Sequence, residues 1–337
     1  MPEMKAQTLI VDGVHSEIKT FDFTPPSASD LTESAVFFGK EGVAYDASGA
    51  ALPFSFLSMP RQHLEAELKT TVQEIFESRR EGAVSLHQHA YIPGLIPGYW
   101  NYYHLLIDCL PRVLLSLQTD CTNPRILVTR FQATRLQRAH GDLWAQLGGI
   151  FGFRESVEVV EGDLLYVERS IVPTTRFRFV GATPQRFQDV ASRICKTGAQ
   201  RRIYVSRKLA TARRVFNEDE VTATLHEFRF QTVLLEQMSL KEQIKLFRES
   251  HVIAGPHGAG LANIVFSEPE TILVEFLHET GLYKVPIFSE LSGMIAGKHV
   301  VLRSKPETNS QHPGHAGNMD MSVDCVALRT TLKSLLG

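Results

Sequence analysis

The stretch H-V-I-A-G-P-H-G-A-G-L-A-N, from His251 to Asn263, sets an apolar segment directly before a turn of small residues. A second apolar segment follows at once. This order predicts a buried strand that runs through a tight turn into a helix. The patterns on both sides of this unit decide the fold class.

The turn at the centre of this stretch is suited to an anion. Gly255, Gly258 and Gly260 allow positive φ angles and close backbone approach, and the amides at a helix start favour phosphate. The spacing G-x-x-G-x-G differs from the dinucleotide fingerprint G-x-G-x-x-G and lacks the lysine of a P-loop. Dehydrogenases and ATPases are therefore disfavoured. A turn that needs glycine only for packing is the alternative.

Strand and helix patterns alternate on both sides of this unit. The alternation predicts a parallel sheet covered on both faces, with its ligand at the carboxyl ends of the strands. In the second half of the chain, the expected strands are 202–206, 231–234, 251–254 and 271–276, and the expected helices are 218–227, 240–249 and 261–266. In the first half, strands at 83–86, 125–128, 157–160 and 170–172 and helices at 62–80, 102–117 and 132–147 predict a second layered α/β domain.

Length and turn residues suggest two domains with a crossing between them. A chain of 337 residues is long enough for two cores. Pro173 and Pro184 mark the crossing. The expected divisions are an N-terminal domain (1–172), the crossing (173–200), a C-terminal domain (201–305), and a loop with a final helix (306–337) that packs back toward the N-terminal domain.

Composition excludes several classes of protein. The chain has 35 Lys and Arg against 37 Asp and Glu, a net charge of −2, so nucleic acid is not an expected partner. The four cysteines form no C-x-x-C pair, which disfavours a zinc knuckle and a disulfide framework. The sequence has no signal-peptide pattern and no apolar run of about 18 residues, so a cytoplasmic protein is expected. Attachment to the inner face of a membrane through a surface patch is left open.

A basic segment ends another predicted strand. In R-R-I-Y-V-S-R-K, residues 201–208, Ser206, Arg207 and Lys208 fall where the strand should end, at the sheet edge where ligands bind. A guanidinium there can pair with a diphosphate. A solvated basic loop, balanced by the acidic residues 218–220, explains the segment equally well.

The segment N-Y-Y-H-L-L-I-D-C-L-P-R, residues 101–112, opens the long apolar helix. His104 and Asp108 are four residues apart and share a helix face, with Arg112 one turn further. An imidazole held against a carboxylate suits general-base chemistry. A pair that only braces a buried helix is the alternative. A metal site is disfavoured because H-E-x-x-H and Asp-x-Asp are both absent.

Together these segments resemble glycosyltransferase family 61, the group often labelled capsular polysaccharide biosynthesis (DUF563-like) proteins in bacteria. The resemblance covers about residues 90–337, and its most specific parts are N-Y-Y-H-x-x-x-D-x-L-P-R and G-P-H-G-A-G-L-x-N. It implies a bacterial member of the GT-B type, with two facing Rossmann-like domains and a cleft between them. It further implies an inverting transferase that needs no metal or other cofactor.

The resemblance also implies roles for individual residues. Asp108 would be the base that deprotonates the acceptor, with His104 orienting it or taking that role itself. Glu275, at a strand end, would face the ribose, although pairing with an arginine is an equally simple account. The residues expected at the donor nucleotide are Ser206, Arg207, Lys208, His257, Gly258, Ala259, Gly260, Asn263 (bracing the turn) and Glu275, and those expected at the acceptor or as braces are Asn101, Tyr103 and Arg112.

The expected activity is transfer of a sugar from a nucleotide-sugar donor, most simply a UDP-sugar, to a hydroxyl of a glycan or lipid-linked glycan. Capsular, exopolysaccharide or lipopolysaccharide biosynthesis would be the setting. One alternative is a non-catalytic protein that binds nucleotide-sugars or glycans on the same scaffold. Another is a metal-dependent hydrolase built around His104 and Asp108. The sugar, the linkage and the oligomeric state are left open.

Overall fold

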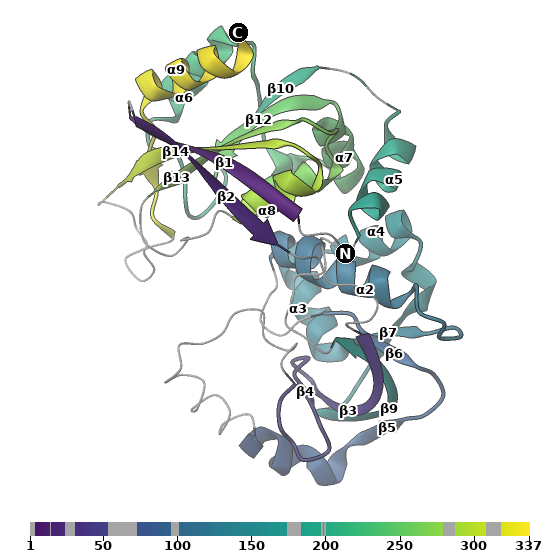
Figure 1. The fold of residues 1–337 in the computed structure, drawn as a ribbon. Coiled ribbons are helices and arrows are strands. Elements are labelled where there is room, and N and C mark those ends of the chain that lie inside the picture. The colour runs from purple at the N-terminus through teal and green to yellow at the C-terminus, as the bar shows by residue number, and fades with distance from the viewer. Residues whose placement is uncertain are drawn as a thin grey trace. The chain divides into compact units, whose positions relative to one another are not determined.

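The computed structural model describes residues 4–13, 15–23, 31–52, 73–95, 101–173, 183–196, 198, 200–278, 287–307 and 318–337. The chain divides into two compact units, shown in Figure 1. Unit 1 comprises Met1 and Pro25–Thr183, and unit 2 comprises Pro2–Thr24 and Pro184–Gly337. Each contains its own sheet, so the predicted mixed α/β class is confirmed.

Unit 2 is built on a sheet with the strand order β11-β10-β12-β13-β14-β1-β2, and β15 pairs with β14. All neighbouring pairs from β11 to β1 are parallel, and β2 pairs antiparallel with β1. The strands are β1 (Met4–Asp12), β2 (His15–Phe23), β10 (Arg201–Val205), β11 (Gln231–Val233), β12 (Ser250–Pro256), β13 (Ile272–His278), β14 (Lys298–Pro306) and β15 (Met321–Ser322).

The strand order reverses between β10 and β12. From β10 the chain moves outward to β11, then crosses back to place β12 on the other side of β10. Ligands of open α/β sheets bind outside the carboxyl ends of the strands at such a reversal. The topology therefore predicts a ligand site at the carboxyl ends of β10 and β12.

Helices cover both faces of this sheet, as Figure 1 shows. On one face α6 packs against α9, and their apolar side chains join the main core of unit 2. On the other face α5, α7, α8 and η8 pack on one another. The helices are α5 (Pro184–Ile194), α6 (Glu218–Glu227), η7 (Leu235–Gln237), α7 (Leu240–Arg248), η8 (Ala259–Phe266, a 3-10 helix), α8 (Ile287–Met294) and α9 (Cys325–Leu336).

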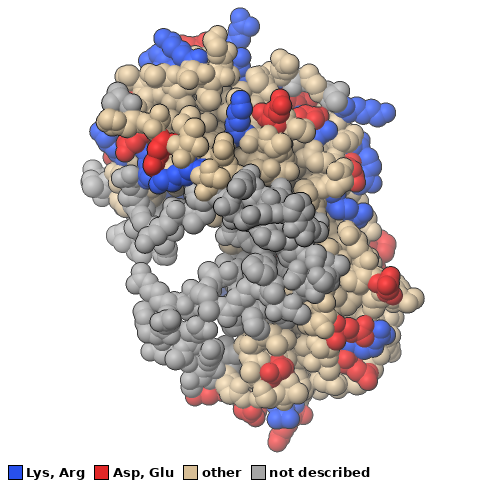
Figure 2. All heavy atoms as spheres, in the orientation of Figure 1, with Lys and Arg blue, Asp and Glu red and all other residues tan. Residues whose placement is uncertain are grey.

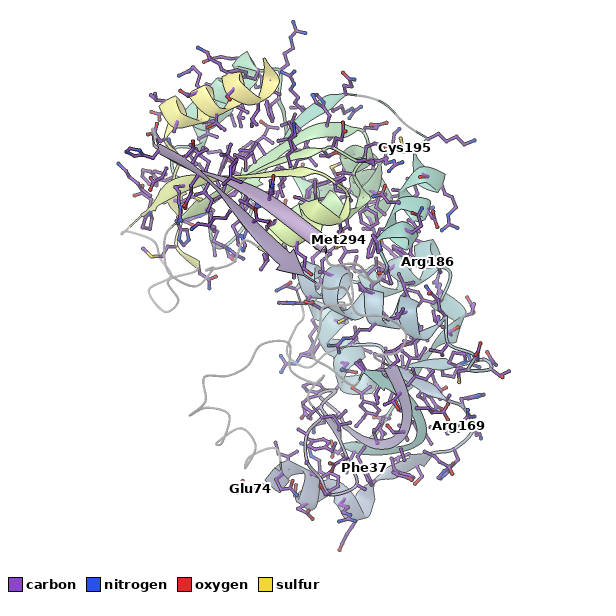
Figure 3. The ribbon with its side chains drawn as sticks, viewed as in Figure 1. Phe37, Glu74, Arg169, Arg186, Cys195 and Met294 are labelled. Carbon is purple, nitrogen blue, oxygen red and sulfur yellow. The ribbon has the colours of Figure 1, made fainter. Side chains whose placement is uncertain are left out.

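Unit 1 contains a mixed sheet with the order β4-β3-β9-β6-β7-β8, and β5 pairs with β9. In Figure 3 the labelled Phe37 lies on β3. Its ring packs edge-on against Phe76, with the two ring centroids 5.2 Å apart. The strands are β3 (Leu31–Gly39), β4 (Ala44–Tyr45), β5 (Val84–Leu86), β6 (Tyr91–Pro93), β7 (Arg125–Thr129), β8 (Val157–Val160) and β9 (Leu164–Pro173). The helices are 73–79, η3 (Arg80–Gly82), η4 (His104–Cys109), α2 (Leu110–Ser116), α3 (Arg130–His140), α4 (Leu143–Phe151) and η5 (Arg154–Ser156).

The N-terminal hairpin joins the sheet of unit 2, whereas the sequence analysis assigned residues 1–172 to a single N-terminal domain. β1 pairs in parallel with β14, with Thr8 opposite His299. The final helix α9 likewise lies in unit 2, where it packs on α6 and β1, although the sequence suggested that it turns toward the N-terminal domain. Leu328 and Leu332 are fully buried in the core of unit 2, which accounts for the apolar face of this helix.

Some predicted elements differ in extent. The single helix expected at 132–147 is two helices, α3 and α4, because the chain breaks at Gly141 with φ 58° and ψ −131°. Helix α8 had no counterpart in the prediction, and β9 is longer than the strand expected at 170–172. Of the helix expected at 62–80, residues 73–79 are helical and residues 62–72 lie outside the described part of the chain.

Candidate functional site

The glycine turn (residues 255–260) begins in the last two residues of β12, at the carboxyl edge of the unit 2 sheet and beside the end of β10. None of the three glycines uses the positive φ that the sequence allows. Their β-carbons would instead meet close neighbours: the backbone of β10 at Gly255, and side chains at Gly258 and Gly260. A β-carbon on Gly255 would lie 3.0 Å from the carbonyl oxygen of Val205 in β10. Gly258 has φ −179°, an extended conformation, but a β-carbon there would collide with the guanidinium of Arg207.

Arg207 therefore lies directly against the glycine turn. Its Nε and Nη2 donate to the carbonyl oxygen of Ala212 at 3.2 and 2.8 Å. These two bonds hold the guanidinium plane in place while Nη1 points at Gly258. A half-buried guanidinium beside the start of η8 is an arrangement suited to a diphosphate.

The two neighbours of Arg207 behave differently from it. Ser206 is 3% exposed, and its hydroxyl donates to Glu218 at 2.7 Å and accepts from the amide of Lys208 at 3.1 Å. Tyr204 donates to the same Glu218 oxygen at 2.9 Å. Ser206 thus fixes the path of the chain after β10, whereas the Lys208 side chain is exposed.

His257 and Glu275 form a buried hydrogen-bonded contact behind the turn. His257 Nδ1 bonds one carboxylate oxygen of Glu275, and His299 Nε2 bonds the other at 2.9 Å. Burial opposes the charge on Glu275, but His257 and His299 outweigh it and lower the pKa of this carboxyl to about 2. Glu275 is 0% exposed, and both of its oxygens bond imidazoles. The sequence suggested a ribose or an arginine as its partner and did not suggest two histidines.

The remaining residues of the turn extend into η8. Ala259 and Gly260 begin this 3-10 helix, where a regular helix was expected, and both are partly exposed. Asn263 is fully buried and donates to Gln243 of α7 at 2.9 Å. This bond ties η8 to α7. The role of Asn263 in bracing the turn stays a prediction.

His278 is a neighbour of this site that the sequence analysis missed. It ends β13 and is 4% exposed. Burial lowers its pKa, and electrostatic interactions with His257 and Arg213 add to this effect. The sequence contained a signal for His278, because this residue comes two positions after the strand expected at 271–276, at the same sheet edge as Glu275.

A second cluster lies in unit 1, on the π-helical turn η4. The backbone amide of His104 donates to the side chain of Asn101 at 3.1 Å. His104 Nδ1 lies 2.6 Å from Asp108 Oδ2. Isolated π-helical turns are often found at functional sites. The sequence-predicted pair is thus present, held on one side of the helix.

Exposure separates the two members of this pair. The side chain of His104 is 23% exposed and that of Asp108 is 2% exposed. The second Asp108 oxygen, Oδ1, is buried and accepts no hydrogen bond from the described residues. Of the two groups, His104 is the one that solvent reaches.

Arg112 and Tyr103 complete this cluster. Arg112 is 5% exposed. Burial lowers its pKa, and the nearby Cys109 and Asp108 counteract that effect, so the guanidinium compensates the buried carboxylate. Tyr103 packs its ring edge-on against His104 at 5.3 Å. Both residues thus lie beside the His104–Asp108 pair, and their expected roles at the acceptor or as braces stay predictions.

The sequence model of the glycosyltransferase 61 family matches residues 102–274, about half of the chain. The match begins in the η4 cluster and ends one residue before Glu275. The chain therefore belongs to the glycosyltransferase 61 family. Within it, the predicted residues of both clusters fall inside the match except Asn101 and Glu275.

Two plant enzymes are similar to parts of the chain. The beta-1,2-xylosyltransferase RCN11 of Oryza sativa subsp. japonica is 29% identical over 90 residues, which is 26% of this chain and 16% of that protein. A beta-1,2-xylosyltransferase of Arabidopsis thaliana is 34% identical over 77 residues, 19% of this chain and 14% of that protein. The matched part of the chain thus spans less than a fifth of the length of either relative.

Two further findings concern the surface and the membrane. On the face shown in Figure 2, acidic and basic side chains are interspersed over the described residues. None of the helices in the described ranges is both long and apolar enough to cross a bilayer. A cytoplasmic location stays a prediction.

Proposed function

We propose that this protein is an inverting glycosyltransferase that moves a sugar from a nucleotide-sugar, most simply a UDP-sugar, to a hydroxyl of a glycan or lipid-linked glycan acceptor. The observation that carries the proposal is the 2.6 Å contact between His104 and Asp108 inside the family-matched segment. An imidazole oriented by a buried carboxylate is a common form of general base.

His104 is the better candidate for the base in this proposal. The sequence favoured Asp108, with His104 as its orienting partner or as the base itself. The buried Asp108 carboxylate is shielded, whereas part of the His104 side chain is exposed. The Nδ1–H group of His104 donates a hydrogen bond to Asp108. The other ring nitrogen, Nε2, is therefore the one that takes a proton from the acceptor hydroxyl.

The reaction then needs no covalent intermediate. His104 Nε2 takes the proton of the acceptor hydroxyl as that oxygen forms a bond to the anomeric carbon. The bond between the anomeric carbon and the phosphate oxygen breaks, and the leaving nucleoside diphosphate takes both electrons. The negative charge that develops on it is neutralised by Arg207 and by the amides of the glycine turn.

We further propose a GT-B type protein in which unit 2 holds the donor and unit 1 activates the acceptor. The parallel sheet of unit 2 and its strand reversal support the first assignment. The η4 cluster in unit 1 supports the second. Transfer without a metal ion and a role in bacterial capsular or related polysaccharide biosynthesis belong to the same proposal, and both rest on the family resemblance.

The proposal is tested first by calorimetric titration with UDP, GDP, TDP, CMP and ADP, without metal and again with magnesium or manganese. We expect one nucleotide to bind without metal, and Arg207→Ala to abolish that binding. Arg329→Ala is the matched control, because it removes the same charge from an exposed ion pair with Glu227 on unit 2. Binding that requires metal would contradict the metal-independent part of the proposal.

The second arm separates catalysis from binding. The purified protein is incubated with UDP-sugars and glycan acceptors, and the products are identified by mass spectrometry. UDP-xylose heads the donor panel because the two plant relatives are named as xylosyltransferases. Transfer that is lost in His104→Gln supports the enzyme. Donor binding without transfer to any acceptor supports the non-catalytic alternative.

A further inference from the structure

Behind the glycine turn, polar side chains from both ends of the chain form a continuous buried network. It lies on the face of the unit 2 sheet that α8 and η8 cover. Its members are Thr8 (0% exposed), His257 (5%), Glu275 (0%), Ser289 (1%) and His299 (2%). Buried polar groups are costly unless each finds a partner, so the network calls for a physical reason.

The contacts run in one line through the sheet. His257 bonds Glu275, and Glu275 bonds His299 at 2.9 Å. His299 Nδ1 lies 3.0 Å from Thr8 Oγ1, which donates to Ser289 of α8 at 2.7 Å. The N-terminal strand β1 is thereby connected through three contacts to His257 of the glycine turn.

The sheet register explains why these side chains meet. Thr8 of β1 lies directly opposite His299 of β14, and His299 lies opposite Leu273 of β13. Glu275 is two residues beyond Leu273, so it emerges on the same face of the sheet. Gly255 of β12 lies opposite Glu275.

The ionised carboxylate of Glu275 decides which histidine nitrogens donate to it. Both oxygens of the Glu275 carboxylate accept, one from His257 Nδ1 and one from His299 Nε2. A hydroxyl has one proton to donate, so Thr8 either accepts from a protonated His299 Nδ1 while donating to Ser289, or donates to an unprotonated Nδ1 while accepting from Ser289. The carboxylate is therefore held from two sides and has one orientation in which both of its bonds are made.

We infer that His299 is a positioning residue: by holding Glu275 it fixes His257 with the proton on Nδ1, so that Nε2 is left as a hydrogen-bond acceptor for a hydroxyl of the bound donor. The donor part of this inference rests on the proposed function. Thr8 and Ser289 hold His299 in turn. The N-terminal strand β1 therefore helps to position a residue of the glycine turn, which is far away in the sequence.

A histidine that merely fills space would not control the protonation of His257, and the two roles can be separated. In ¹⁵N-histidine NMR spectra at alkaline pH, the signals of His257, assigned with His257→Gln, report which ring nitrogen carries the proton. We expect the Nδ1–H form in the wild-type protein. His299→Leu should give a mixture of both forms. His299→Gln should restore the Nδ1–H form, because its amide can donate to Glu275 as Nε2 does.

Val300→Ala is the matched control. Val300 neighbours His299 on β14 but belongs to the core on the opposite face of the sheet, so its truncation destabilises the same strand without touching Glu275. An unchanged His257 spectrum in His299→Leu, or an equal change in Val300→Ala, would overturn the inference. If His299→Leu does not fold, Thr8→Val decides in its place: mixed forms support the inference and an unchanged spectrum overturns it.

Binding of UDP tests the connection to the donor. We expect His299→Leu to weaken UDP binding on the order of tenfold, which is about the loss of affinity caused by removing one hydrogen bond to a charged group. His299→Gln should restore the affinity. Unchanged UDP affinity in His299→Leu would overturn the connection. If the wild-type protein binds no nucleotide, the proposed function fails, while the spectrum of His257 still decides the role of His299.

Discussion

The guanidinium of Arg207 occupies the space that a β-carbon on Gly258 would fill. The two residues come from different crossovers of the unit 2 sheet, since Arg207 follows β10 and Gly258 follows β12. Their contact bridges the point where the strand order reverses. It makes the glycine a determinant of where the positive charge lies, and not only of how the turn folds.

Gly258→Ala is expected to displace Arg207 and to leave the fold intact. The backbone at Gly258 is extended, so alanine causes no strain there, and the atom it meets is the flexible end of a side chain. We expect a loss of unfolding free energy below about 1 kcal/mol and a loss of UDP affinity similar to that of Arg207→Ala. Calorimetry and thermal unfolding measure the two quantities.

The double variant provides the control for this prediction. If both substitutions act on the same guanidinium, the affinity of Gly258→Ala with Arg207→Ala equals that of Arg207→Ala alone. Additive losses would show that alanine at position 258 harms binding by another route.

His104→Gln is expected to lower kcat by about 10²- to 10⁴-fold with little change in the KM for the donor, because it removes the proposed base. Asp108→Asn should lower kcat as well, since an amide cannot orient the imidazole as the carboxylate does. Cys109→Ala, at the next position of η4, is the control for packing of the same turn. Retained turnover in His104→Gln together with its loss in Asp108→Asn would return the role of base to Asp108.

Stability is expected to fall in acid through Glu275. Its pKa in the folded protein is about 2, against an ordinary value of 4.5. A carboxyl with a lowered pKa contributes stability that is fully present above the ordinary value and is lost as the pH falls from 4.5 toward 2. The shift corresponds to on the order of 3 kcal/mol. Urea unfolding at a series of acid pH values measures the loss.

Glu275→Gln should flatten that acid dependence and lower stability at neutral pH by about 1–3 kcal/mol, because an amide cannot accept from both histidines. Glu227→Gln is the comparison, since Glu227 pairs with Arg329 at the exposed surface of unit 2. An acid dependence in Glu275→Gln as steep as in the wild-type protein would show that other carboxyls cause it.

Local sequence patterns were sufficient for most of unit 2. Its strands and helices alternate at short intervals, and α7 begins with a capping box in which Ser239 and Glu242 satisfy each other's amides. The pairing of β1 with β14 could not be predicted in the same way, because Thr8 and His299 are separated by most of the chain and no local signal links them. For the same reason the residues Glu275 and His257 were found, but their connection to His299 was not.

Unit 1 shows how a glycine can end a helix that periodicity alone would continue. Gly141 separates α3 from α4 and has φ 58° and ψ −131°, a conformation open to glycine but strained for other residues. We expect Gly141→Ala to lower the unfolding free energy by about 1–3 kcal/mol. Gly149→Ala is the matched control, because Gly149 lies within α4 and a β-carbon there meets nothing within 4 Å. It should stabilise the protein by about 0.5–1 kcal/mol. Equal effects of the two substitutions in urea unfolding would contradict the assignment of Gly141 as the point that divides the helix.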